Sequence, residues 1–132
     1  MNKQRSNMHD ESLLHLRIKS TILDVPGITA QLGIEPTYGF EKGSRVGRHG
    51  PIRDSSVWVL ECDVNTELDM STHIENLLAS LQEANVNNLE CELMIKFCFE
   101  GDNSSFFLPR TLLSELNRLN MGIFVDAYHI YY

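Results

Sequence analysis

Apolar and polar residues alternate along three stretches of the chain, at residues 14–19, 57–64 and 89–100. The first stretch places Leu14, Leu16 and Ile18 on one side and His15, Arg17 and Lys19 on the other. A period of two is typical of a strand with one buried face, so the pattern predicts three strands. The third stretch is the longest and is predicted to be a central strand. Residues 37–42 and 123–132 are rich in aromatic or β-branched residues and predict two more strands.

Two other stretches have leucines at helical spacing. The apolar positions of these two helices are Ile74, Leu77, Leu78 and Leu81 in the first, and Leu112, Leu113, Leu116 and Leu119 in the second. Asp69 or Ser71 is the expected N-cap of the first helix. Pro109 is expected to open the second, and Gly122 stands where a C-cap glycine is expected.

A third, short helix is predicted within residues 24–36. Asp24 or Gly27 can cap its start, and Pro26 suits the first turn. Ile28 and Leu32 are four residues apart and share one face. Gly33 can adopt the left-handed conformation that ends a helix, and Pro36 prevents the helix from resuming. We expect Trp58, the only tryptophan, to pack near this short helix.

The order of these elements predicts an α+β fold: a mainly antiparallel sheet of about five strands with two longer helices and one short helix, in a two-layer sandwich. The chain of 132 residues is long enough for one domain with a real core, which we assign to residues 13–132. Residues 1–12 are expected to form a flexible polar tail. No cofactor is implied by any motif.

The sequence has no apolar run of membrane-spanning length and no signal peptide, so we expect a cytoplasmic protein without a membrane partner. The three cysteines, Cys62, Cys91 and Cys98, lie in apolar stretches without metal-ligand spacing. They are expected to be buried, reduced thiols.

Charge is unevenly distributed in this chain, whose formal net charge is −7. Between Asp54 and Ile95 there are nine acidic residues and no lysine or arginine. These charges can simply be solvated faces of the protein. The alternative is an acidic surface that attracts a basic partner. The residues expected to make that contact are Glu61, Asp63, Glu67, Asp69 and Glu75.

A glycine-rich loop just upstream is basic instead. It carries Lys42, Arg45, Arg48 and Arg53, and arginine forks suit phosphate or carboxylate groups. One interpretation is that this loop is simply solvated. The other is that the domain binds an anion or a metabolite, with or without enzymatic activity, through loop 42–53 and a cleft beside Trp58. The order of Lys42, Gly43 and Ser44 does not match a nucleotide-binding phosphate loop.

The residue pattern gives little support for metal binding, catalysis or nucleic-acid binding. No histidines have zinc-hydrolase spacing, and no nucleophile is visibly paired with a base, so no metal-ligating or catalytic residues are assigned. His15 and His129 would meet only if the first and last strands pair. The negative charge argues against nucleic acid as a partner. Tyr128, Tyr131 and Tyr132 make the last strand an alternative surface for a homodimer.

Several short patterns, taken in order, resemble a known family. They are Leu32-Gly33-Ile34-x-Pro36, Gly43, Arg53, Trp58-x-Leu60, the helix at Leu77–Leu81, and the Leu112–Leu119 helix leading to Gly122 and Ile130-Tyr131. Together they resemble the small bacterial proteins grouped as domain of unknown function 4279. The resemblance implies a compact α+β fold and a bacterial cytoplasmic setting, and it assigns no catalytic residues. Where the pattern has a serine after Trp58-x-Leu60, this chain has Glu61-Cys62.

Small acidic bacterial proteins are often immunity proteins, so analogy adds an expectation about function. We expect a non-enzymatic protein-binding domain of the immunity type, which neutralises a basic toxin domain through the acidic surface.

Overall fold

The computed structural model describes residues 12–64, 69–99 and 107–129. Along the chain the elements are β1 (Leu13–Ser20), α2 (Val25–Leu32), β2 (Tyr38–Phe40), β3 (Ser56–Cys62), α3 (Met70–Ser80), β4 (Glu90–Phe99), α4 (Arg110–Arg118) and β5 (Gly122–His129). This order and the α+β class confirm the prediction from sequence.

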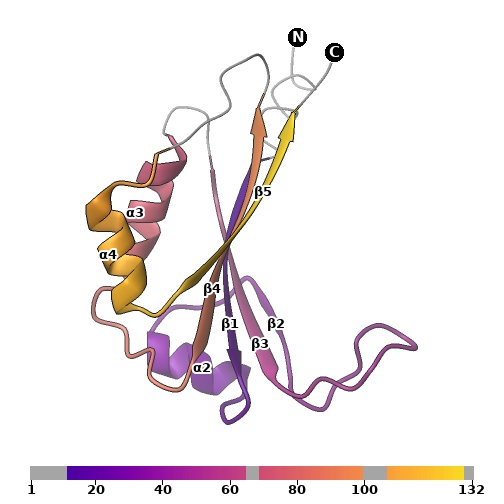
Figure 1. Ribbon diagram of the computed structural model, residues 1–132. Coiled ribbons are helices and arrows are strands. Elements are labelled where there is room, and N and C mark those ends of the chain that lie inside the picture. Colours follow the sequence, from indigo (N-terminus) through magenta and orange to yellow (C-terminus); the bar gives the residue numbers. More distant parts are fainter. Residues whose placement is uncertain (1–11, 65–68, 100–106, 130–132) are drawn as a thin grey trace.

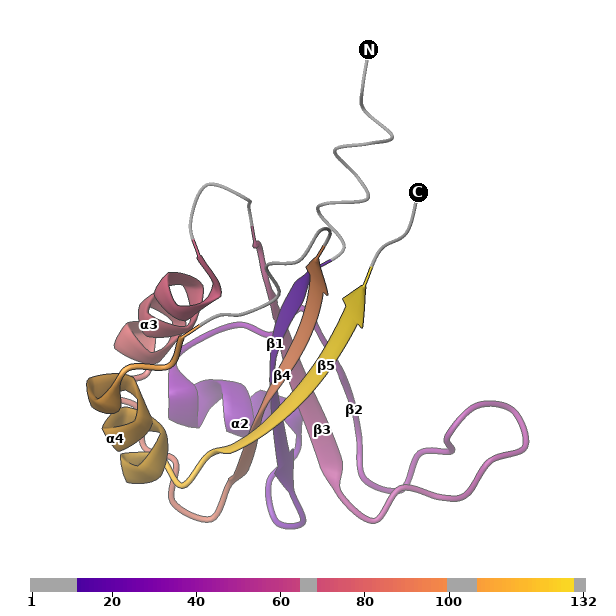
Figure 2. The same ribbon diagram turned by 45° about the horizontal axis from the view of Figure 1, so that its top comes forward.

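The five strands form one sheet in the order β2-β3-β1-β4-β5. All neighbouring pairs are antiparallel except β4 and β5, which are parallel because α4 carries the chain across between them. The middle strand is therefore β1, whereas β4, predicted to be central, is an interior strand next to the edge strand β5. The three helices lie on one side of the sheet, and the connection between β2 and β3 reaches away from the body (Figures 1 and 2).

The core lies between the helices and the sheet face that they cover. Each of the three inner strands contributes alternate residues to it, and these are almost completely buried: Leu14, Leu16, Ile18, Trp58, Cys91, Leu93 and Ile95. The helices contribute most of the leucines predicted from their spacing, including Leu78 and Leu116, but Leu113, which was predicted to belong to the apolar stripe of α4, is exposed instead. The period of two therefore identified the buried face of β1 and of β4 correctly, whereas in β3 Val57 and Val59 on the opposite face are buried as well.

The short helix α2 has the predicted ends. The Asp24 carboxylate accepts a hydrogen bond from the Gly27 amide (2.8 Å), and Gly33 adopts a left-handed conformation with φ of 75°. The Gly33 amide donates to the Thr29 carbonyl (2.8 Å). The indole Nε1 of Trp58 donates to the Thr29 hydroxyl (3.1 Å), so Trp58 packs beside this helix as expected.

Replacing Gly33 by valine is expected to destabilise the domain by about 1 kcal/mol or more, because a β-branched residue disfavours positive φ. A Cβ at Gly33 would meet nothing within 4 Å, so the loss would come from backbone strain alone. Chemical denaturation measures it, with Gly33→Asn as the control because asparagine tolerates this conformation. Equal stability of the valine variant and wild type would contradict the assignment.

The end of the last helix differs from the prediction. Gly122 does not cap α4: the helix ends at Arg118 with Leu119 as its C-cap, Asn120 takes the positive φ of 50°, and Gly122 already begins β5 opposite Glu92. The first and last strands do not pair, because the neighbours of β1 are β3 and β4, so the condition under which His15 and His129 were expected to meet is not fulfilled. The predicted tail lies outside the described residues except for Ser12, whose hydroxyl hydrogen bonds with the Cys98 backbone.

None of the three cysteines forms a disulfide; Cys91 is buried as predicted, whereas Cys62 and Cys98 are only partly buried. Burial raises the pKa of Cys62 and of Cys91 from 9.0 to about 11, and the Asp63 charge adds to the effect at Cys62. Because the thiolate is the reactive form, each is expected to alkylate about 100-fold more slowly in the folded protein than in urea. Mass spectrometry after iodoacetamide treatment at pH 8 checks this. Equal labelling of Cys91 in both states would contradict it.

Candidate functional site

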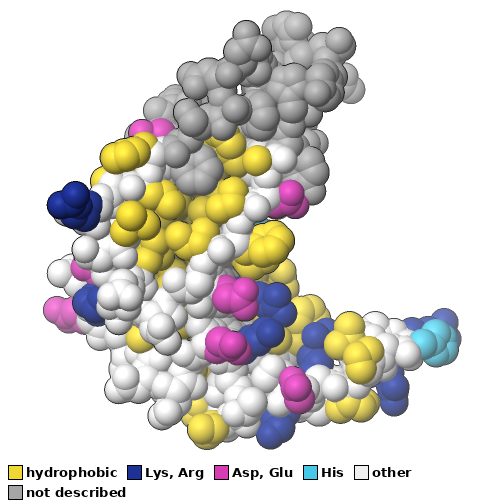
Figure 3. All heavy atoms as spheres, viewed as in Figure 1, with side chains coloured by type: hydrophobic (Ala, Val, Ile, Leu, Met, Phe, Trp, Pro, Cys, Tyr) yellow, Lys and Arg dark blue, Asp and Glu magenta, His cyan; other side chains and the backbone are white. Residues whose placement is uncertain are grey.

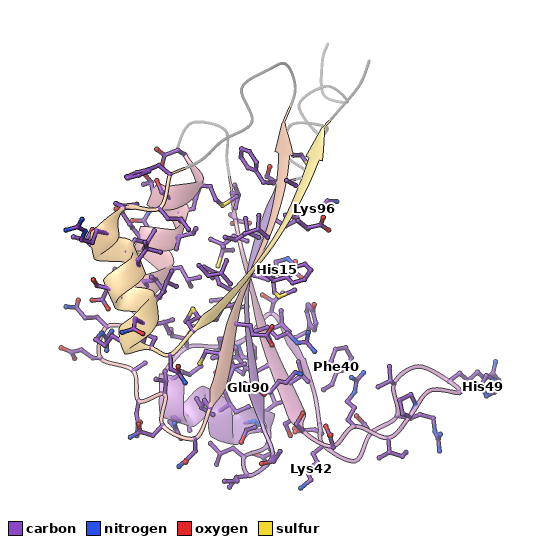
Figure 4. All side chains as sticks on the ribbon, viewed as in Figure 1. His15, Phe40, Lys42, His49, Glu90 and Lys96 are labelled. Carbon is purple, nitrogen blue, oxygen red and sulfur yellow. The ribbon has the colours of Figure 1, made fainter. Side chains whose placement is uncertain are left out.

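The face of the sheet opposite the helices carries the most varied chemistry among the described residues. His15, Arg17 and Lys19 of β1 point to this face because their neighbours along the strand enter the core. Tyr38 and Phe40 of β2 are 41% and 42% exposed there. In Figure 4, His15 and Phe40 lie on the side of the sheet away from the helices. We call this surface the open face.

A cavity of about 250 Å³ lies on the open face. We call it the cradle. Its lining comes from β1, β2, β3, β4 and the end of the segment that precedes β3, and consists of His15, Arg17, Tyr38, Phe40, Arg53, Val57, Val59 and Met94. Val57 and Val59 form an apolar floor, being only 7% and 5% exposed although no helix covers them. The cradle therefore combines cationic groups with an apolar and aromatic lining.

Arg53 is held against an aromatic pair. Its Cζ atom lies 4.1 Å from the centroid of the Phe40 ring, a cation–π arrangement, and the Phe40 and Tyr38 rings meet edge to face with centroids 5.7 Å apart. The Arg53 Nε is buried and has no hydrogen-bond partner within the described residues. A buried donor left unpaired generally costs about 1–3 kcal/mol, so this arrangement is not explained by stability alone.

The basic side chains of the cradle have acidic neighbours but no hydrogen-bond or ion-pair partners among the described residues. Cross-strand pairing places His15 opposite Glu61 and Arg17 opposite Glu92. Within residues 12–64, 69–99 and 107–129, no hydrogen bond or ion pair joins the side chains of His15, Arg17 or Arg53 to another residue. The guanidinium groups of Arg17 and Arg53 thus keep their capacity to bind an acceptor.

The segment between β2 and β3, residues 41–55, forms a projecting arm. Its two sides are joined by hydrogen bonds, among them Gly43 N to Arg53 O (2.9 Å) and Arg53 N to Ser44 O (2.7 Å). Apolar and basic side chains lie next to one another along it (Figure 3), and Val46 and Ile52 are 42% and 54% exposed. The glycine-rich basic loop of the sequence is therefore a hydrogen-bonded arm that stands out beside the open face.

The four basic residues predicted as an anion site do not converge. The Lys42 ammonium donates to the Thr21 carbonyl (3.1 Å), and Arg45 Nη1 donates to the Gly50 carbonyl (3.0 Å). Arg48 is exposed next to His49, which marks the tip of the arm in Figure 4. Only Arg53 reaches the cradle. Trp58 lines no cleft, because it is fully buried on the helix-covered face.

The five acidic residues predicted to bind a partner are also dispersed. Glu61 lies on the open face, Asp63 is exposed just beyond β3, and Glu75 lies on α3 on the other side of the sheet. Asp69 caps α3, where its carboxylate accepts from the Thr72 amide, the Thr72 hydroxyl and the Ser71 hydroxyl. Glu67 lies outside the described residues. The acidic stretch of sequence is thus divided between two faces.

The cap at Asp69 predicts a pH dependence. Hydrogen bonds from Thr72 and then Ser71 lower the pKa of Asp69 below 3.8, so its contribution to stability is complete above pH 3.8 and is lost as the pH falls through the lowered pKa. An Asp69→Asn variant keeps the cap without this titration. The difference in melting temperature between wild type and Asp69→Asn is expected to stay constant above pH 3.8 and to shrink in stronger acid. A constant difference throughout would contradict the assignment.

Sequence reasoning missed His15, Arg17 and the aromatic pair as site residues. One signal was present: β3 has apolar residues on both of its faces, Trp58 and Leu60 on one and Val57 and Val59 on the other. A strand with two apolar faces requires cover on both. Tyr38, Phe40 and Arg53 supply that cover on the open face.

Two absences apply to the described part of the chain. None of its helices is long and apolar enough to cross a membrane. No group of three histidine, cysteine or acidic side chains gathers there in a way that could hold a metal ion.

The fold and the site together define a two-layer α+β domain with one helix-covered sheet face and one open face bearing a cationic, aromatic cradle. The chain belongs to the family described as Domain of unknown function (DUF4279), whose model matches residues 9–129. This confirms the resemblance seen in the sequence. Among curated proteins, none matches the chain.

Proposed function

We propose that this domain is a non-enzymatic protein-binding module and that the open face, together with the arm, is the surface that receives the partner. The observation that carries the proposal is the apolar and aromatic exposure on that side. Tyr38, Phe40, Val46 and Ile52 are each more than two-fifths exposed. Exposed apolar clusters on small domains mark interaction sites, and tyrosine and arginine are common anchors in interfaces.

Affinity capture from the native host at low salt tests this proposal. The wild-type domain is compared with a Tyr38→Ser/Phe40→Ser double variant and with Leu113→Ser as the matched control. Leu113 is 48% exposed on α4, in the helix layer, so its replacement removes a similar exposed apolar group away from the open face. Thermal melts establish that all three proteins are folded.

A protein retained by wild type and by Leu113→Ser, but lost from the double variant, is the expected result. Retention by the double variant and loss from Leu113→Ser would move the contact to the helix layer and contradict the proposal. Retention of no protein by the wild type at low salt would also defeat it.

A narrower form of the proposal makes the domain an immunity protein that neutralises a basic toxin. It is supported by the net charge of −7 and by three acidic residues, Glu61, Glu90 and Glu92, whose strand positions direct them to the open face. In this form Glu61 contacts the partner from the open face, whereas Glu75 lies across the sheet.

Co-expression with the product of the neighbouring gene tests the immunity role. The wild-type domain should suppress the growth defect that this product causes, Glu61→Lys should weaken suppression at least tenfold in viable count, and Glu75→Lys should leave it unchanged. A neighbouring product that is harmless by itself, or equal protection by all three proteins, would rule out this narrower form.

A further inference from the structure

We infer that the cradle binds a monocarboxylate attached to an apolar body. This inference goes beyond protein binding and does not depend on it. The sequence suggested an anion site formed by four basic residues of loop 42–53. Only one of these four, Arg53, lines the cradle, so the site proposed here keeps Arg53 alone from that loop.

The cationic part of the cradle supplies the anion recognition. Arg17 and Arg53 come from different strands or segments and line the same cavity, and within the described ranges neither guanidinium has an acceptor. A guanidinium presents its donors in a planar fork that matches the two oxygens of a carboxylate. Stacking on Phe40 fixes the plane of Arg53 before a ligand arrives, which reduces the entropy lost on binding.

The apolar part of the cradle supplies room for a small ligand body. Val57 and Val59 form the floor, Met94 lines another part of the cavity, and the edge-to-face pair of Tyr38 and Phe40 stands beside them. At about 250 Å³ the cavity is at the small end of ligand sites, which suits a single ring or one aliphatic side chain.

Acidic residues on the open face favour a singly charged ligand over a doubly charged one. Glu92 stands opposite Arg17 and Glu61 stands opposite His15, so two negative charges lie on the face of the sheet that carries both guanidinium groups. Repulsion from these carboxylates penalises a doubly charged phosphate more than a singly charged carboxylate. A carboxylate with an apolar body therefore fits both the charge and the lining of the cradle.

Two sources of this chemistry are a free aromatic acid and the carboxyl terminus of a peptide that ends in an apolar residue. Benzoate represents the first and N-acetylphenylalanine the second. Benzamide has nearly the same shape as benzoate without the charge, acetate lacks the apolar body, and inorganic phosphate represents the dianion.

Methyl NMR of the purified wild-type domain gives a direct readout at Val57, Val59 and Met94. Benzoate or N-acetylphenylalanine is expected to shift these methyl resonances saturably, and the tighter of the two identifies the source. Benzamide, acetate and phosphate should each bind at least tenfold more weakly. Absence of saturable shifts with both carboxylates, or equal binding of benzamide, would overturn the inference.

Variants locate the site. Arg53→Met is expected to weaken carboxylate binding at least tenfold, and Arg53→Lys to weaken it less, because charge is kept while the fork is lost. Arg45→Met is the matched control, since Arg45 is already bonded to the Gly50 carbonyl within the arm. If Arg53→Met does not fold, Arg17→Met makes the same test from β1. Unchanged affinity in the folded Arg53 or Arg17 variant would overturn the inference, whatever the outcome of the protein-capture experiment.

Discussion

A Trp58→Ala variant is expected to lose about 3–5 kcal/mol of unfolding free energy, the range typical of removing a large aromatic side chain from a core. Trp58 is fully buried between β3 and the helix layer. Its indole also donates a hydrogen bond to the Thr29 hydroxyl, so the alanine variant loses both packing and the link between β3 and α2. Since small domains are stable by roughly 5–15 kcal/mol, this is a large share of the total.

Two further variants separate the contributions at Trp58. Trp58→Phe keeps most of the apolar volume and is expected to fall between wild type and alanine. Thr29→Val removes the acceptor and leaves the indole N–H unpaired, for an expected loss of about 1–3 kcal/mol. Urea denaturation followed by circular dichroism measures all three. A loss below 1 kcal/mol in Trp58→Ala would show that this residue does not join the two layers as described.

A Gly39→Ala variant is expected to lose stability by about 1–3 kcal/mol, as overpacked sites do, and to lose the cradle as well. A Cβ at Gly39 would lie 2.9 Å from both γ carbons of Val25 and from the Val57 carbonyl oxygen. Neither neighbour can yield easily, because one belongs to α2 and the other to the backbone of β3. We therefore expect β2 to move away from β3, and Tyr38 and Phe40 to move with it.

Gly122→Ala is the matched control for Gly39→Ala. Gly122 is also a strand glycine, but a Cβ there would be no closer than 3.9 Å to its nearest neighbour, the Glu92 side chain. Its replacement is expected to change stability little. Partner retention and melting temperature are compared for both variants. Equal behaviour of the two would contradict the close approach of β2 to α2.

The fold could be predicted from sequence to the extent that it depends on local patterns. Alternation identified the buried faces of β1 and β4, and the caps at Asp24, Gly33 and Asp69 followed from residues whose backbone or side-chain preferences are strong. The end of α4 was wrong because Asn120, which also tolerates positive φ, stops the helix before Gly122 is reached. Strand order was not predictable, since pairing joins segments far apart in the chain.

The residues of the candidate site could not be brought together from sequence, because their proximity depends on the strand order. Arg53 was singled out from the sequence, but its relevant neighbours, Phe40 and Arg17, become neighbours only through the pairing of β2 with β3 and of β3 with β1. The acidic stretch from Asp54 to Ile95 failed as a single surface for the same reason. It runs through β3, α3 and β4, so the fold divides its charges between the open face and the helix layer.

The residues that carried the family resemblance have mostly structural roles. Gly33 ends α2, and Trp58 joins β3 to that helix. Arg53 is different, because it lies on the open face with an unpaired, buried Nε. Among these family-pattern residues it is the one whose arrangement points to binding rather than to stability.

Methyl NMR of the domain mixed with its captured partner tests the central claim most directly, because it reports both sides of the sheet at once. If the open face receives the partner, the largest shifts will occur at Val57, Val59 and Met94, and the methyl groups of Leu112, Leu113 and Leu116 in α4 will change little. The reverse pattern, with shifts along α4 and none at the two valines, would contradict the account.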